Sequence, residues 1–149
     1  MTNTEPFADD DTIARVLRET HTWAVVGCSS NPERASHRVS RTLMREGYLM
    51  IPVNPRETEV HGQKAYADLF SAQAEAVAAG HPIEVVDIFR NSAHAGTHVD
   101  EAIEIGAKAV WLQLGVIDEA AAERAQQAGL WVVMDRCPAI ELPKLSLGA

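Results

Sequence analysis

The fold is decided by residues 22–36, TWAVVGCSSNPERAS. Trp23 to Val26 form a short apolar run with the length of a buried strand, and Gly27 ends it. The polar residues that follow lead into a helix, which is predicted from about Ser36 to Glu46. A buried strand, a glycine and a helix in this order indicate the first unit of a parallel α/β sheet.

Similar pairs of an apolar run and a helix continue along the chain. Further strands are predicted at 48–53, 83–89, 109–114 and 130–134, and further helices at about 10–20, 68–79, 92–106 and 118–129. This alternation predicts a Rossmann-like α/β three-layer sandwich, with a five-stranded parallel sheet and helices on both faces. Right-handed crossovers favour the strand order 3-2-1-4-5, with a ligand crevice between the loops after Gly27 and Leu114. Residues 135–149 are expected to wrap around the surface.

Length and composition limit the classes of protein. The 149 residues suit a single domain over 1–149, with a core at about 22–142. The formal net charge of −8 argues against nucleic-acid binding. No run approaches the ~18 apolar residues of a membrane helix, and the acidic N-terminus lacks a signal-peptide pattern. We therefore expect a cytoplasmic protein that binds no membrane.

The loop after Gly27 has the composition of an anion site. Glycine lets the backbone turn sharply, and hydroxyls with free N–H groups ahead of a helix attract phosphate. The alternative is an ordinary polar loop with Ser36 as the helix cap. The candidate binding residues in this segment are Gly27, Cys28, Ser29, Ser30, Asn31, Arg34 and Ser36.

The dinucleotide fingerprint G-x-G-x-x-G is absent, since Ser29 and Pro32 stand where its later glycines would be. After the second strand, Val53-Asn54-Pro55-Arg56 replaces the acidic residue that accepts the ribose hydroxyls of NAD. An arginine suits a phosphorylated ribose instead. The sequence thus disfavours NAD and leaves NADP or coenzyme A (CoA).

Arginines follow several of the predicted strands, so they are expected at one edge of the sheet. Guanidinium groups bind phosphate through two parallel hydrogen bonds. Five arginines have such positions, and we expect about two of them to touch a ligand. Asp87 and Asp135, near strand ends, are expected to orient arginines. The five arginines are Arg34, Arg38, Arg56, Arg90 and Arg136.

At this level of detail the sequence resembles the small CoA-binding-domain proteins of bacteria and archaea. It is also similar to the N-terminal domain of the succinyl-CoA synthetase α subunit. The resemblance spans about 22–142. It is carried by the segments VVG (25–27), SNPER (30–34), IPVNP (51–55), VDIFR (86–90), WLQLG (111–115) and MDRC (134–137).

The resemblance implies that Ser29, Ser30, Asn31 and Ser36 surround the CoA pyrophosphate. Arg56 matches the position of a lysine near the nucleotide in the synthetase domain. Two departures are a long segment at 71–82, and Ala35 and His37 where proline and tyrosine are expected. The remaining residues expected along CoA are Val53, Asn54, Phe89, Arg90, Leu112, Gln113 and Leu114.

The sequence therefore predicts a stand-alone module that binds CoA or an acyl-CoA and catalyses no reaction, since no nucleophile, base and orienting group occur together. One alternative is an NADP-dependent oxidoreductase, and another is a scaffold or regulatory protein without a nucleotide. No metal site is expected, because Cys28 and Cys137 are far apart and His94 with His98 lacks a third ligand. Cys28 could exchange with a CoA thiol, but a packed, unreactive residue is favoured. The acyl group and any protein partner are left open.

Overall fold

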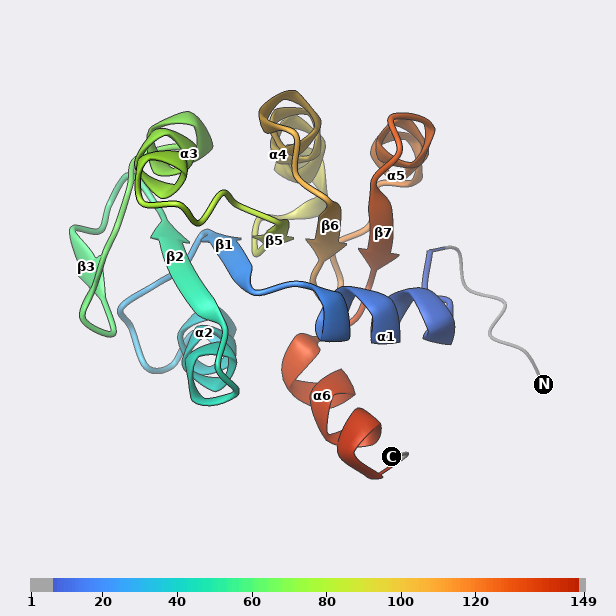
Figure 1. Ribbon diagram of the computed structural model, residues 1–149, viewed down its shortest axis with the longest axis horizontal. Helices are drawn as coiled ribbons and strands as arrows, with labels where there is room; N and C mark the ends of the chain where they lie inside the picture. The colour runs from blue at the N-terminus through green and yellow to red at the C-terminus, as the bar shows by residue number, and fades with distance from the viewer. Residues whose placement is uncertain (1–6, 148–149) are drawn as a thin grey trace.

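The computed structural model describes residues 7–147 as a parallel sheet between two layers of helices (Figure 1). The sheet strands are β1 (Thr22–Val26), β2 (Leu49–Val53), β5 (Val85–Ile88), β6 (Ala109–Leu112) and β7 (Trp131–Met134). One face carries α1 (Asp10–Glu19), α2 (Ala35–Arg45) and α6 (Pro138–Leu147). The other carries α3 (Leu69–Ala78), α4 (Ser92–Ile105) and α5 (Glu119–Gln127). The predicted fold class is confirmed, and no helix within 7–147 is long and apolar enough to cross a membrane.

The strand order is β2-β1-β5-β6-β7, or 2-1-3-4-5 when only the sheet strands are counted, so the predicted order 3-2-1-4-5 is wrong. The reason is that α3 lies on the face opposite α2 (Figure 1). A right-handed crossover on that face places β5 on the far side of β1. A crossover on the other face would have placed β5 beyond β2, at the outer edge of the sheet. The strand order therefore reverses between β1 and β5, and the crevice of the fold begins there.

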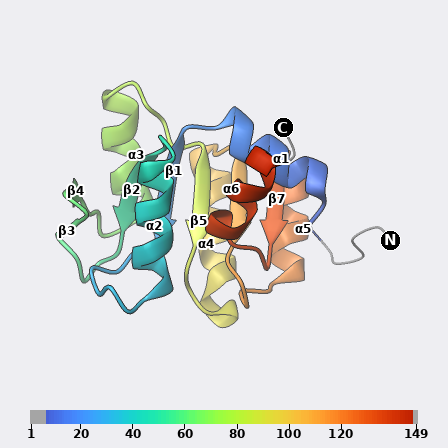
Figure 2. The same cartoon turned by 90° about the horizontal axis from the view of Figure 1, so that it is seen from below.

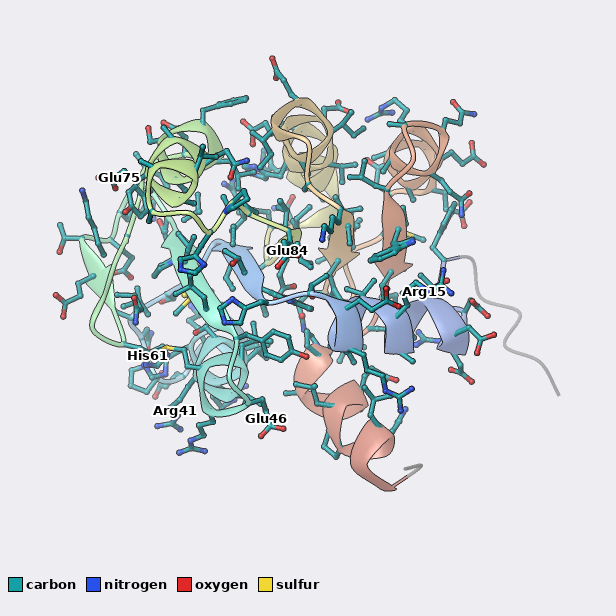
Figure 3. All side chains as sticks on the ribbon, viewed as in Figure 1. Arg15, Arg41, Glu46, His61, Glu75 and Glu84 are labelled. Carbon is teal, nitrogen blue, oxygen red and sulfur yellow. The ribbon has the colours of Figure 1, made fainter. Side chains whose placement is uncertain are left out.

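A small antiparallel hairpin, which the sequence analysis did not predict, leads from β2 toward α3. It consists of β3 (Glu59–Val60) and β4 (Gln63–Lys64), joined by a turn at His61-Gly62. Both turn residues have positive φ, 54° and 78°, as a two-residue hairpin requires. The His61 ring lies 4.2 Å from that of His37 in α2, centroid to centroid (Figure 3). The hairpin is thereby packed against α2.

Two apolar clusters hold the layers together, one on each face of the sheet. Val26, Ile88 and Leu112 point toward α3, α4 and α5, whereas Val25 and Trp111 point toward α1, α2 and α6. Alternate residues of each strand pack into the clusters on opposite faces of the sheet, because successive side chains of a strand point to opposite faces. The strands are therefore buried on both faces, as in other parallel sheets.

Residues 135–149 were expected to wrap around the surface, but the chain forms α6 there. Pro138 stands at the first helical position, where its fixed φ suits a helix and its missing N–H costs nothing. The carbonyl oxygen of Cys137 accepts the N–H groups of Ile140 and Glu141, both at 3.0 Å. Viewed from below, α6 lies over the same face of the sheet as α2 and α1 (Figure 2). Of these residues, 148 and 149 lie outside the described part of the chain.

Asp87, in the middle of β5, is fully buried, and its strand neighbours are Val25 and Trp111. Neither carboxyl oxygen has a hydrogen-bond partner within the described residues, so the expectation that Asp87 orients an arginine is wrong. Burial raises the pKa of Asp87 well above its usual range. Asp87 in the folded protein therefore stays protonated to a higher pH than an exposed aspartate does.

This burial predicts a specific dependence of stability on pH. Relative to Asp87→Asn, the wild type should lose free energy of unfolding as the pH rises above about 4, because Asp87 ionises in the unfolded chain but stays protonated when folded. The gap should grow by about 1.4 kcal/mol per pH unit up to the folded pKa. Urea denaturation between pH 4 and 8 measures it, with Asp11→Asn as the exposed control. Parallel curves for wild type and Asp87→Asn would show that Asp87 ionises in the fold.

Candidate functional site

Gly27 brings the loops after β1 and β5 together at the point where the strand order reverses. Its N–H donates to the Val53 carbonyl at 2.8 Å, and the Phe89 N–H donates to Val26 at 2.9 Å. Gly27 has a φ of +82°, and a Cβ there would lie 2.9 Å from the Phe89 carbonyl oxygen. Only glycine fits this close approach without strain. A side chain at position 27 would therefore disturb the fold before it met a ligand.

The loop between Gly27 and α2 is held by its own side chains. The Ser36 hydroxyl accepts the N–H of Ser29 at 3.0 Å, and the Ser29 hydroxyl accepts the N–H of Asn31 at 3.0 Å. Asn31 Oδ1 in turn accepts the N–H of Glu33 at 3.0 Å. Ser36 is thus not the helix cap, since Arg34 holds the N-cap position of α2. Its hydroxyl fixes the conformation of the loop.

The N-terminus of α2 opens beside this loop without a side-chain cap. Arg34 is the N-cap residue and makes no capping hydrogen bond, and no acidic residue lies in the first turn. The first N–H groups of a helix lack intrahelical partners and carry partial positive charge. The first turn of α2, at Ala35 and Ser36, can therefore bind an anion.

Glu57 is an acidic residue of the site that the sequence analysis missed. Its Oε2 accepts hydrogen bonds from the backbone N–H of Ser30 at 2.8 Å and from the Ser30 hydroxyl at 2.9 Å. Asn54 fixes the same turn, because its amide donates to the Cys28 carbonyl at 3.0 Å and accepts the Arg56 N–H at 3.0 Å. A carboxylate therefore occupies donors that were expected to bind phosphate. Glu57 directly follows Arg56 in the sequence, so a carboxylate beside the predicted phosphate site could have been expected from the sequence.

Two cavities lie at this edge of the sheet and share the wall residues Ala35, Phe89 and Arg90. The first, which we call the polar cavity, has a volume of about 670 Å³ and is lined by the charged and hydroxyl side chains of the two loops. The second, the apolar cavity, has a volume of about 580 Å³ and lies between α2, α6 and the loop after β6. The two cavities therefore adjoin at these shared residues, and together we call them the crevice.

Most of the predicted residues line this crevice. Gln113 and Leu114 line the apolar cavity, and Phe89 and Arg90 line both. Ser30 and Asn31 lie on the exposed loop beside the crevice. The predicted residues of the polar cavity are Gly27, Ser29, Arg34, Ser36, Val53, Asn54, Arg56, Phe89 and Arg90.

Cys28 and Leu112 are both fully buried and line neither cavity, so their side chains do not have the predicted position along a ligand. Leu112 points into the core under α3 to α5, because side chains alternate along β6. Burial raises the pKa of the Cys28 thiol to about 11. Cys28 is therefore a packed thiol, as the favoured interpretation held.

The predicted arginines are only partly brought together. Arg34, Arg56 and Arg90 line the polar cavity, and Arg38 joins Arg90 at the apolar one, whereas Arg136 lines neither. Asp135 was expected to orient an arginine, and its backbone carbonyl accepts a hydrogen bond from Arg136 Nη1 at 2.7 Å, while its carboxylate Oδ1 accepts the N–H of Gly115 at 2.8 Å. It thereby holds the loop that carries Leu114 and Gly115 at the rim of the apolar cavity.

Several residues of the crevice were not predicted. His98 and Glu101 of α4 line the polar cavity and lie 2.8 Å apart, Nδ1 to Oε1. Cys137 and Ile140 line the apolar cavity and were missed because α6 was not predicted. Pro138, placed before a run with Ile140 and Leu142, was the available signal for that helix. Among the described side chains, no group of three metal-ligating residues occurs.

Solved structures share this fold over nearly the whole chain. A hypothetical protein from Pyrococcus horikoshii OT3 has a TM-score of 0.85 and 34% identity, covering 98% of this chain and 99% of that one. A Thermus thermophilus protein has a TM-score of 0.81 and 32% identity, with 92% and 98% covered. A Thermus thermophilus dehydrogenase in complex with NAD is similar over a smaller part, 73% of this chain and 38% of that one, with a TM-score of 0.53 and 12% identity, which is a likeness of fold alone.

Sequence comparison gives the family. The uncharacterized protein YneT of Bacillus subtilis (strain 168) is 35% identical over 125 residues, which cover 84% of this chain and 87% of YneT. Residues 21–143, from just before β1 into α6, match the CoA binding domain family. The match includes both loops and the helix that enclose the crevice, and on this ground the chain belongs to the CoA binding domain family.

Proposed function

We propose that this protein binds CoA or an acyl-CoA in the crevice and catalyses no reaction by itself. The observation that carries the proposal is the junction of a polar and an apolar cavity through Ala35, Phe89 and Arg90. CoA has a matching shape, with a phosphorylated nucleotide at one end and a thin pantetheine arm at the other.

The polar cavity suits the phosphates. It is lined by the uncapped first turn of α2 and by Arg34, Arg56 and Arg90. Each is a cationic or dipolar donor of the kind that binds phosphate oxygens. This local arrangement acts at contact distance, so the net charge of −8 does not prevent it, because salt screens charges beyond about 8–10 Å.

The apolar cavity favours CoA over NADP. Its walls include Val39, Val116 and Ile140, which offer apolar surface to an alkyl chain. The pantetheine arm and a short acyl group have this character, whereas the nicotinamide half of NADP brings a second ribose and a charged ring. The oxidoreductase alternative leaves the apolar cavity without an obvious occupant.

Ligand choice tests the function directly. CoA should raise the melting temperature, as must any ligand that binds only the folded state, whereas NAD at the same concentration should not. Native mass spectrometry of freshly purified protein should show a retained species with the mass of CoA or an acyl-CoA. Equal stabilisation by NAD, or NADPH turnover by the protein, would contradict the proposal.

Arg56 is the residue we expect to bind the 3′-phosphate of CoA. It lines the polar cavity at the end of β2, and within residues 7–147 its guanidinium makes no ion pair. Wild type should prefer CoA over dephospho-CoA by about one to two decades in affinity, the equivalent of about 1.5–3 kcal/mol. Arg56→Ala should lose most of that preference in calorimetry and keep its affinity for dephospho-CoA.

The matched control is Arg41→Ala, because Arg41 is an exposed residue of α2 that lines neither cavity (Figure 3). It removes the same charge and should leave the preference for CoA intact. Equal weakening of both ligands by Arg56→Ala would assign the 3′-phosphate to another arginine.

Glu57 should weaken CoA binding in the wild type, because its carboxylate already occupies the Ser30 N–H and hydroxyl. Glu57→Ala frees these donors and removes a negative charge from the polar cavity. We expect CoA affinity to rise by about tenfold, or ~1.4 kcal/mol, in calorimetry. Glu59→Ala removes an equal charge from the exposed hairpin and should change little. Weaker binding by Glu57→Ala would mean that Glu57 supports the loop and does not compete with the ligand.

A further inference from the structure

Cys137 lies between β7 and α6 and lines the apolar cavity. The N–H groups of Ile140 and Glu141 donate to its carbonyl oxygen, which fixes Cys137 at the N-terminal end of α6. Cys137 is 7% exposed and is one of the residues that line the apolar cavity, which is where the thiol end of a pantetheine arm would reach.

Gln113 provides an independent sign that a polar ligand enters this cavity. It lines the same cavity, is only 5% exposed, and its side-chain Oε1 has no hydrogen-bond partner among the described residues. A buried acceptor without a partner costs free energy, so it points to a ligand that donates a hydrogen bond there. The pantetheine arm carries amide N–H groups along its length and ends in a thiol.

We propose that Cys137 exchanges with CoA disulfide to form a mixed disulfide between the protein and CoA, with Gln113 positioning the pantetheine arm. The proposal rests on the proposed function, because the nucleotide end must be held in the polar cavity. The Cys137 thiol first gives its proton to solvent, and the thiolate attacks one sulfur of CoA disulfide. The S–S bond of the disulfide breaks, a new S–S bond joins Cys137 to one CoA, and the second CoA leaves as a thiolate that takes up a proton. Cys137 is oxidised and the departing CoA is reduced, so no other oxidant is needed.

The two cysteines differ in the properties that this reaction requires. Cys28 is fully buried in the core, lines neither cavity, and has a pKa raised to about 11 by burial. Cys137 is also buried, at 7% exposure, but it lines the apolar cavity and immediately precedes α6. The modification should therefore occur at one cysteine only, and Cys28 serves as an internal control.

The test is incubation of the reduced protein with CoA disulfide, followed by intact-protein mass spectrometry. Wild type and Cys28→Ala should each gain one CoA, and dithiothreitol should remove it. Cys137→Ser should gain none. Glutathione disulfide has no nucleotide to bind in the polar cavity. At equal concentration it should react at least about tenfold more slowly, because binding raises the local concentration of CoA disulfide and not of glutathione disulfide. A CoA adduct on Cys28, or equal rates with the two disulfides, would overturn the proposal.

Calorimetry with reduced CoA separates this proposal from the proposed function. The wild type should bind reduced CoA reversibly and without a covalent adduct, which measures the binding function without the exchange. If CoA binds but no adduct forms, the exchange is refuted and the binding function stands. If CoA does not bind the wild type at all, the proposed function fails and the exchange fails with it.

Gln113→Met tests the positioning role, because it keeps the length of the side chain and removes the acceptor. The rate of exchange with CoA disulfide should fall by about fivefold or more, since one hydrogen bond to the arm is lost. The rate with glutathione disulfide should stay unchanged. A loss of structure would change the rates of exchange with both disulfides. A lower rate with CoA disulfide alone therefore identifies a contact between Gln113 and the pantetheine arm. Equal effects on both would refute it.

Discussion

The backbone of Gly27 passes so close to Phe89 that a Cβ at position 27 would lie 2.9 Å from the Phe89 carbonyl oxygen. This contact exists because β1 and β5 are neighbours in the sheet, while α2 and α4, the helices that follow them, lie on opposite faces (Figure 1). The loops after β1 and β5 are in contact at Gly27 and Phe89 and then diverge toward opposite faces of the sheet, and the crevice lies where they diverge. Phe89 and Arg90 consequently belong to the walls of both cavities.

The polar half of the crevice is organised before any ligand arrives. Ser29, Asn31 and Ser36 use their side chains to hold the loop, so the conformation does not depend on a bound phosphate. Such preorganisation lowers the cost of binding, because less conformational freedom is lost. Glu57 acts in the opposite direction, since its carboxylate already satisfies the donors of Ser30. The affinity for an anion is thus set by a balance between the open first turn of α2 and a carboxylate that competes with the ligand.

The apolar half depends on α6, the last element of the described chain. This helix lies beside α2 on the same face of the sheet and contributes Ile140 and Cys137 to the cavity wall (Figure 2). Without α6 the side chains of Val39 and Val116 would face solvent. The C-terminal segment therefore forms part of the wall of the apolar cavity.

The sequence by itself determined the α/β class, the five strands, most of the helices and the loop from Gly27 to Ser36, because periodicity, glycines and capping residues are local signals. Asp68 and Asp118 cap α3 and α5 by hydrogen bonds that span three residues. Only the tertiary structure decided the strand order, because α3 could have crossed either face, and nothing local encodes which. The same holds for the contact of Glu57 with Ser30, 27 positions apart, and for the burial of Asp87 and Cys28. These features depend on which surfaces meet in the folded chain, and contacts between residues far apart in the sequence produce no local sequence pattern.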